Sequence, residues 1–259
     1  MPGTSFDRVA SIYDETRGGE RRGNHFADDL AAWIRGSRVV ELGVGTGVIA
    51  NGLRHHGVDV VGIDLSDAMM RAAVERIGPR VAVADVDRLP LADASVDTAL
   101  FVWVLQLVPD PIATLAEAAR VVRPGGRIIT ILSNGEYAPG DEMSPIFDEL
   151  AALRPERLPR DRLSAADIEG LTLEHDGFTG WDEFASSVSD QIAGIEERIY
   201  SSMFDIDDTT WERVVDPVLT RLRALPDPDR PRQRRNRHPL LVWTITPGVW
   251  VGSGGDGHR

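Results

Sequence analysis

Three glycines and one acid near residue 40 have the spacing of a ligand-binding loop. Gly43, Gly45 and Gly47 occupy alternate positions. Glu41 lies two residues before the first of them. A loop without Cβ atoms can turn tightly and let a ligand approach its backbone, and a helix that follows it offers free N–H groups. The residues in this loop therefore indicate a ligand that lies close to the main chain.

The same loop indicates which ligands do not fit. A dinucleotide loop has the spacing G-x-G-x-x-G, whose third glycine would fall on Val48, and a P-loop requires G-K-[ST]. The sequence has neither pattern here. A carboxylate at Glu41 would repel a pyrophosphate, whereas it would attract an ammonium group. The loop therefore favours a positively charged ligand without phosphates, and it speaks against a nicotinamide-dependent oxidoreductase.

Two further acids close later apolar runs. Asp64 ends "VVGID" and Asp85 ends "VAVAD". A carboxylate after the second strand can accept both hydroxyls of a ribose. The second acid could accept from an exocyclic amine, while the N–H of Val86 meets a ring nitrogen. A nucleoside with an amino-acid tail satisfies all of these groups, and S-adenosylmethionine is such a ligand.

These groups can meet only if strand ends lie at one edge of a sheet. Apolar runs predict strands at 38–43, 59–64, 80–85, 96–104 and 127–132, with helices at 47–55, 66–77 and 110–122 between them. Strands that alternate with helices and are apolar throughout are typical of a parallel sheet covered on both faces. We expect an α/β, Rossmann-like doubly wound sheet, mostly parallel, with a late antiparallel strand at 237–246. Its ligand would lie at the carboxyl ends of the strands.

The remaining segments suggest how the chain is divided. We expect N-terminal cap helices over 1–36, the cofactor-binding α/β core over 37–135, a helical lid or substrate region with one strand over 136–236, the final core strand over 237–248 and a flexible tail over 249–259. The strand of the lid region is expected at 177–185. Helical apolar spacing at 187–225 places Ile192, Ile195, Ile199 and Met203 on one face.

Five ordered segments resemble a known family. They are "FDRVASIYDETR" (6–17), "VVELGVGTG" (39–47), "VVGIDLSDAMMRAA" (60–73), "VADVDRLPLADASVDTALFVWVLQLVPD" (83–110) and "RVVRPGGRIITI" (120–131). The chain resembles the class I S-adenosylmethionine-dependent methyltransferases, in the small-molecule branch that includes the ubiquinone/menaquinone-biosynthesis type. The resemblance implies S-adenosyl-L-methionine as cofactor and S-adenosyl-L-homocysteine as product.

The resemblance also implies which residues bind the cofactor. Glu41 and the Phe101 carbonyl would meet the methionine amino group. Arg17 would pair with the methionine carboxylate. The full implied set is Tyr13, Arg17, Glu41, Gly43, Gly45, Gly47, Asp64, Leu65, Met69, Asp85, Val86 and Phe101. Within it, Tyr13 closes over the cofactor from the N-terminal helix, and Leu65 and Met69 flank the adenine.

Fewer residues in the sequence indicate where the methyl acceptor binds. Many relatives have a histidine pair after the fourth strand, where this chain has Gln106 and Leu107. No catalytic residue is therefore assigned, and the histidine and acid spacings predict no metal site. The candidates for contact with the acceptor are Gln106, Tyr137, Tyr200 and Phe204.

The composition limits the classes of molecule that are expected to bind this protein. The 259 residues carry a net charge of −13 and no cysteine. Such an acidic chain gains little from attraction to phosphates, so DNA is not expected as a partner and RNA is disfavoured. The arginine-rich run "RPRQRRNR" (230–237) is the exception, and a solvated loop is its more common meaning. We expect a cytoplasmic protein without a membrane segment that methylates a small molecule; the oligomeric state stays open.

Two other functions remain open from the sequence. A tRNA or protein methyltransferase is the alternative enzyme, supported by the arginine-rich run. A non-catalytic S-adenosylmethionine-binding protein is the alternative outside catalysis, because the histidine pair is missing.

Overall fold

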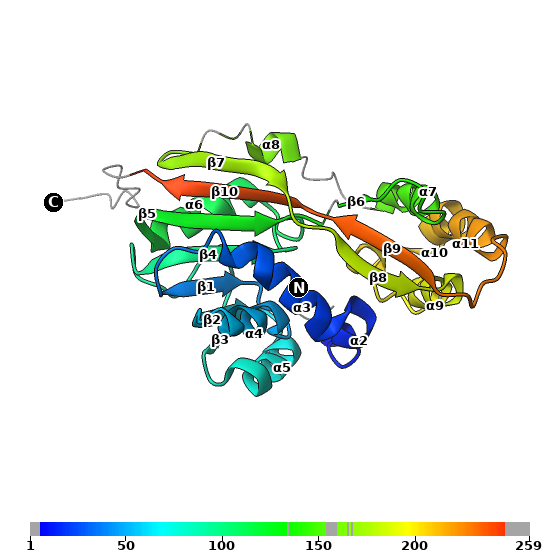
Figure 1. Ribbon diagram of the computed structural model, residues 1–259, viewed down its shortest axis with the longest axis horizontal. Helices are drawn as coiled ribbons and strands as arrows, with labels where there is room; N and C mark the ends of the chain where they lie inside the picture. Colours follow the sequence, from blue (N-terminus) through cyan, green and yellow to red (C-terminus); the bar gives the residue numbers. More distant parts are fainter. Residues whose placement is uncertain (1–5, 134, 154–159, 165, 167, 247–259) are drawn as a thin grey trace.

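A seven-stranded sheet forms the main body of the protein (Figure 1). The computed structural model describes residues 6–133, 135–153, 160–164, 166 and 168–246; the tail expected at 249–259 lies outside them. The strands are β1 (Val39–Leu42), β2 (Val60–Asp64), β3 (Val81–Val83), β4 (Val96–Val102), β5 (Val122–Ile131), β7 (Leu171–Phe178) and β10 (Pro239–Ile245). Their order in space is β3-β2-β1-β4-β5-β10-β7.

The direction of the strands confirms the expected fold class. β1 to β5 run parallel, and β10 runs antiparallel to both β5 and β7. The order in space reverses at β1, which lies between β2 and β4. In a doubly wound sheet the ligand crevice opens at such a reversal, outside the carboxyl ends of the strands. The glycine-rich segment after β1 is therefore at the place where a ligand is expected.

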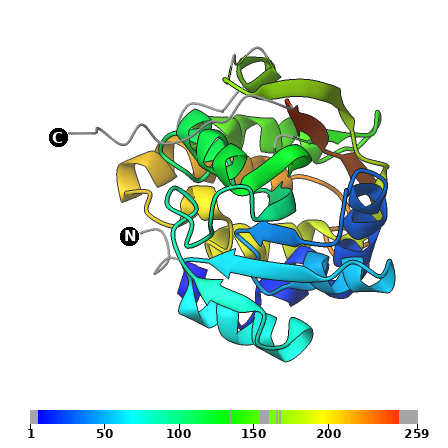
Figure 2. The same cartoon turned by 90° about the vertical axis from the view of Figure 1, so that its left-hand side faces the viewer.

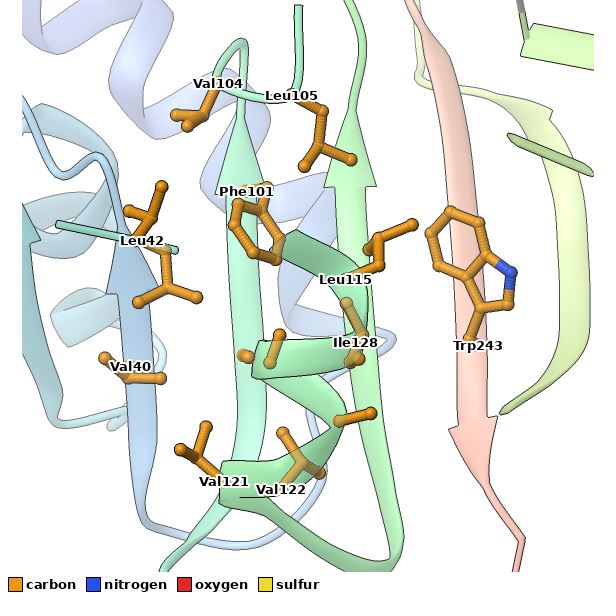
Figure 3. Close-up of a cluster of buried hydrophobic side chains, with 14 of the residues drawn as sticks. Val40, Leu42, Phe101, Val104, Leu105, Leu115, Val121, Val122, Ile128 and Trp243 are labelled. Atoms are coloured by element: carbon orange, nitrogen blue, oxygen red, sulfur yellow. The ribbon is translucent and has the colours of Figure 1, made fainter. Parts of the chain in front are cut away.

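Helices cover both faces of this sheet. α3 (Gly19–Ala31), α4 (Val48–His55) and α5 (Asp67–Ile77) share one hydrophobic cluster with one face. α6 (Pro111–Val121) and α8 (Arg160–Ser164) pack on the other. Figure 3 shows this second cluster, in which Phe101 and Leu115 lie between the strands and α6. Figure 2 shows β7 (yellow-green) at one edge of the sheet and α5 (cyan) on the side of the other edge strand, β3.

Two helices of the main body begin with side-chain caps that the sequence signals. The Ser66 hydroxyl accepts from the Met69 N–H at the start of α5. The Asp110 carboxylate accepts from two backbone N–H groups at the start of α6, where Pro111 occupies the first turn. Such side-chain oxygens satisfy N–H groups that have no partner within the helix. The predicted starts of both helices are confirmed.

A smaller lobe lies beyond the carboxyl ends of β1 and β5 (Figure 1). Its sheet has the order β6-β9-β8 and is antiparallel. The strands are β6 (Glu136–Tyr137), β8 (Asp182–Ser186) and β9 (Arg232–Arg237), and the helical segments are α7 (Ser144–Phe147), η1 (Asp148–Leu153), α9 (Val188–Glu196), η2 (Ser201–Met203), α10 (Asp208–Thr210), η3 (Trp211–Val215) and α11 (Asp216–Arg223). These helical segments share their own hydrophobic cluster. The expected helical region is therefore present, in shorter pieces.

The strand content of residues 136–236 differs from the expectation of one strand. The described residues there hold β6, β7, β8 and β9. The strand expected at 177–185 falls across the turn between β7 and β8, because Gly177 and Phe178 still belong to β7. β7 itself was missed because only Leu171, Leu173 and Phe178 of its residues are large and apolar, which is too few for a clear strand pattern.

The arginine-rich run was wrongly expected to be a solvated loop. It forms β9, whose residues alternate between buried and exposed. Arg232, Arg234 and Asn236 are buried. Four of its five arginines pair with carboxylates: Arg230 and Arg232 with Glu142, Arg234 with Asp141, and Arg237 with Glu136. A period of two in a strand turns every second residue inward, whatever its charge.

None of the helices in the described ranges is long and apolar enough to cross a bilayer.

Candidate functional site

The glycine loop connects β1 to α4 and has a left-handed backbone. Gly43, Gly45 and Gly47 have φ values of 77°, 55° and 79°. L-residues with a Cβ rarely adopt these angles. The N–H groups of Gly43 and Val44 both donate to the Ile63 carbonyl, at 2.7 and 3.0 Å. The loop is thereby held against the end of β2, at the crevice where the strand order reverses.

Replacing Gly43 by alanine separates packing from backbone strain. A Cβ at Gly43 would overlap the Val104 side chain, whereas a Cβ at Gly57 would meet nothing within 4 Å at a similar φ of 73°. We expect Gly43→Ala to lower the free energy of unfolding by about 1–3 kcal/mol more than Gly57→Ala does. Denaturant unfolding of the two variants measures this difference. Equal losses would show that Val104 yields and that the close packing does not hold the loop.

Asp64 holds the loop as well as facing the crevice. One of its carboxylate oxygens accepts from the Gly45 N–H at 2.8 Å, and the other accepts from the Ser66 N–H at 2.9 Å. Burial raises the pKa of Asp64, and these backbone hydrogen bonds oppose the rise. A carboxylate has about four acceptor positions, so both oxygens can still accept a ribose hydroxyl. Sequence reasoning found the residue but not its contact with Gly45.

Glu41 is the most unusual acid of the site. It lies in β1, is 1% exposed, and burial raises its pKa to about 8. The negative charge of Asp64 adds to this rise, and the Ala50 N–H opposes it. Among the described residues, nothing hydrogen-bonds to the Oε2 atom of Glu41. Buried polar atoms nearly always have a partner, so this oxygen fits a ligand that donates a hydrogen bond.

Of the residues expected around the adenine, Leu65, Asp85 and Val86 follow β2 and β3, whereas Met69 lies in α5. Leu65 directly follows β2 and is 42% exposed. Asp85 is exposed, and its carboxylate accepts from the Asp87 N–H at 3.0 Å. Val86 is buried. Met69 lies in a cluster with Val9 and Phe204, beneath the N-terminal segment.

The N-terminal segment covers the glycine loop. α2 (Tyr13–Arg17) is tied to the loop because Asp14 accepts a hydrogen bond from Thr46 and pairs with Arg76. A small cavity, partly open to solvent, lies between α2, α3 and the start of α4. Its lining includes Tyr13, Arg17, Arg22, Val48, Ile49 and Trp103. Tyr13 and Arg17 therefore lie at this cavity.

Arg17 also connects the N-terminal segment to the smaller lobe. Its guanidinium donates to the Ile199 carbonyl at 2.9 Å and lies 4.6 Å from the centre of the Tyr200 ring. Burial raises the pKa of Tyr200, and its hydroxyl donates to Gln191 at 3.3 Å. The segment expected to act as a lid therefore contacts the same helix that covers the glycine loop.

The other acceptor candidates are distributed over three places. The Gln106 amide donates to the Trp103 carbonyl, beside β4. The Tyr137 ring lies 4.5 Å from the Arg234 guanidinium in the small sheet. Phe204 is buried against Phe6, with ring centres 5.4 Å apart, so it packs under the N-terminal segment. None of the three is among the residues that line the cavity.

Phe101 has the position that sequence reasoning gave it. It is the last residue but one of β4 and pairs with Leu42 of β1. Its ring is fully buried between the sheet and α6 (Figure 3). Because the ring of Phe101 packs in the core, the main chain is the part of this residue that can reach the crevice.

Two residues at the cavity, Arg22 and Trp103, were not identified as site residues from the sequence. Arg22 lies in α3, and Trp103 follows β4 with a φ of 57°. A bulky residue in the left-handed region is strained, and such strain is common at binding sites. The position of Trp103 at the end of an apolar strand was a usable signal. No feature of the sequence indicated Arg22, because a charged residue in a helix usually faces solvent.

Comparisons with known proteins agree with this geometry. Residues 40–130 match a family model described as a methyltransferase domain. The demethylmenaquinone methyltransferase of Beutenbergia cavernae is 37% identical over 141 residues, which cover 52% of this chain and 59% of that protein. The chain spans about half the length of the curated relatives that it matches.

Solved structures extend the likeness to the fold. A methyltransferase of Haloferax volcanii, solved in complex with the Trm112 activator, has a TM-score of 0.58 and 22% identity, covering 93% of this chain and 97% of its own. Phosphoethanolamine N-methyltransferase 2 of Haemonchus contortus, solved with S-adenosyl-L-methionine, has a TM-score of 0.52 and 18% identity, covering 93% and 57%. Residues 40–130 therefore match a methyltransferase domain, and the chain resembles class I, S-adenosylmethionine-dependent methyltransferases of the quinone-biosynthesis type.

Proposed function

We propose that this protein transfers a methyl group from S-adenosylmethionine to a small-molecule acceptor in the cytoplasm. The observation that carries the proposal is the buried Oε2 atom of Glu41, which has no hydrogen-bond partner among the described residues. It lies in the strand that leads into the glycine loop, where the amino group of the cofactor would be received. An ammonium group is the ligand feature that such an oxygen accepts best.

The other residues support the same cofactor. Asp64 would accept from the ribose hydroxyls, and Arg17 would pair with the methionine carboxylate. Leu65 and the Val86 N–H would contact the adenine. These roles agree with the match of residues 40–130 to a methyltransferase domain and with the neighbour solved with this cofactor.

The chain contributes orientation and exclusion of water. When bound, the cofactor supplies a methyl group on a positively charged sulfur, which an acceptor atom displaces in line. Holding two reactants in the right geometry lowers the barrier without any proton transfer. α2 performs the covering part, because Asp14 fixes it to the loop and Arg17 fixes it to the lobe. No residue is assigned as general base.

The proposal is tested by following the methyl group. The protein is incubated with methyl-labelled S-adenosylmethionine and three fractions: small metabolites, bulk tRNA and cell protein. We expect label in the small-metabolite fraction together with S-adenosylhomocysteine, and binding of S-adenosylmethionine but not NAD by calorimetry. Label in the tRNA or protein fraction would select the alternative enzyme. Binding without turnover in any fraction would select the non-catalytic protein.

Two observations bear on those alternatives. The arginines of residues 230–237 that pair with carboxylates weaken the one sequence feature that favoured RNA. The net charge of −13 disfavours nucleic acid in general. We therefore propose neither DNA nor RNA as a partner.

A further inference from the structure

Arg22 has an enclosed position on the cavity. Its guanidinium carbon lies 3.9 Å from the centre of the indole of Trp103 and 5.4 Å from the centre of the Phe26 ring. The side chain keeps 21% of its surface accessible, and the residue lines the cavity. A planar guanidinium that stacks on an aromatic ring keeps its N–H edges available for a planar anion. Arg22 is thus held in place while part of it faces the cavity.

The charge of Arg22 is only partly balanced. Within the described residues, the one carboxylate within 4 Å of its guanidinium is Asp182, at 3.7 Å. Asp182 is buried and also pairs with Arg21. The other polar neighbour is His238, whose Nε2 lies 3.4 Å from Nη2 of Arg22. Burial and the charge of Arg22 lower the pKa of His238 to about 3, so His238 is neutral and adds no negative charge.

Arg17 adds a second cation to the same cavity. Its charge is the second cause, after burial, that lowers the pKa of Arg22, to about 10, against the attraction of Asp182. Arg17, Arg21, Arg22 and Arg76 carry four positive charges around this cavity, and Asp14, which lines it, and Asp182 carry two negative charges. The methionine carboxylate of the cofactor would balance one of the two that remain. One positive charge is then left for another ligand.

Trp103 offers a further hydrogen-bond donor beside Arg22. Among the described residues, its buried Nε1 atom has no hydrogen-bond partner, and Trp103 lines the cavity. Trp103 lies within residues 40–130, and Arg22 of α3 lies outside them.

We propose that Arg22, stacked on Trp103, binds a carboxylate of the methyl acceptor, so that the acceptor is a small carboxylic acid rather than an uncharged quinone. The proposal rests on the proposed methyl transfer. A carboxylate carries the single negative charge that the cavity lacks, and its two oxygens match the two N–H groups on one edge of a guanidinium. Arg22 lies outside residues 40–130, which match the methyltransferase domain, and the relatives named for quinones match about half of this chain.

Benzoate and benzamide test the proposal, because they have the same shape and differ in charge. Both are titrated by calorimetry into the protein saturated with S-adenosylhomocysteine. We expect benzoate to bind at least tenfold more tightly than benzamide. We also expect Arg22→Met to lower benzoate affinity at least tenfold and Arg22→Lys to give an intermediate loss. Arg80→Met, which removes a charge paired with Asp59 on the surface, should leave benzoate affinity within twofold.

The outcomes separate this proposal from the proposed function. Equal affinity for benzoate and benzamide, or no benzoate binding, overturns the carboxylate site even if Arg22→Met does not fold. A loss of S-adenosylhomocysteine affinity in Arg22→Met as large as the loss for benzoate also overturns it, since Arg22 would then bind the cofactor's carboxylate. Failure of the wild-type protein to bind the cofactor refutes the proposed function instead. Selective benzoate binding that requires Arg22 would still support an anion site in that case.

Discussion

Replacement of Asp64 by alanine is expected to weaken S-adenosylmethionine binding by about 1.5–3 kcal/mol, or roughly tenfold to more than a hundredfold in Kd. Two effects combine in this loss. The ribose hydroxyls would lose a charged acceptor. The Gly45 N–H would lose the carboxylate oxygen that accepts from it at 2.8 Å, so the glycine loop would be held to β2 only by the hydrogen bonds of Gly43 and Val44 to the Ile63 carbonyl.

Isothermal calorimetry of three aspartate variants measures this expectation. Asp85→Ala removes an exposed acid at the next strand end, where water competes, so its loss should be smaller. Asp59→Ala removes a surface acid paired with Arg80 and should change the affinity less than twofold. An Asp64→Ala affinity within twofold of the wild type would contradict the assigned role. Asp64→Asn does not rescue binding, because its amide N–H2 would face the N–H of either Gly45 or Ser66.

The fold of residues 38–132 was predictable because several local signals agree there. Each strand is a short apolar run, and Ser66 and Asp110 mark helix starts that the structure confirms. The alternation of strands and helices leaves few topologies once crossovers must be right-handed. The strand order itself came only from the structure, because periodicity carries no information on which strands are neighbours.

The second half of the chain was less predictable because its order depends on distant contacts. β9 is rich in arginine and would normally be interpreted as a loop. It forms a strand by pairing with β6 and β8, and its buried Arg234 donates to Asp141, 93 residues away, at 2.6 Å. An isolated arginine gives no local sign of such a partner. The same reason explains why Arg22 was missed, since its neighbours Trp103, Asp182 and His238 come from three distant segments.

The residues expected to bind the cofactor were partly predictable from the sequence. Glu41, Asp64 and the glycines were found because strand ends and loop spacing are local features. The motif gave no indication that Asp64 holds Gly45 or that the Oε2 atom of Glu41 lacks a partner. Burial and pairing are properties of the folded chain. The acids could therefore be identified from the sequence, whereas their burial, hydrogen-bond partners and pKa shifts come from the structure.

The protonation state of Glu41 is expected to make the affinity for the cofactor depend on pH. Burial raises the pKa of Glu41 from 4.5 to about 8, so the ligand-free protein holds a neutral Glu41 at pH 6 to 7. A cofactor ammonium prefers the carboxylate form, so its binding must release the proton. We expect the affinity to rise by nearly tenfold per pH unit between pH 6 and 7.5. The rise should end near pH 8, where α-amino groups lose their own proton.

Glu41→Gln provides the control and a second readout. It should bind the cofactor weakly, with no rise between pH 6 and 7.5, and calorimetry in buffers of different ionisation enthalpy should detect release of about one proton only in the wild type. Glu41 binds its proton more tightly when folded, so its contribution to stability is complete below about pH 4.5 and is lost as pH rises towards 8. The ligand-free variant should therefore be more stable than the wild type at pH 8 and similar to it at pH 4.5. A wild-type affinity that stays constant from pH 6 to 7.5, without proton release, would mean that Glu41 is not the group that receives the amino group.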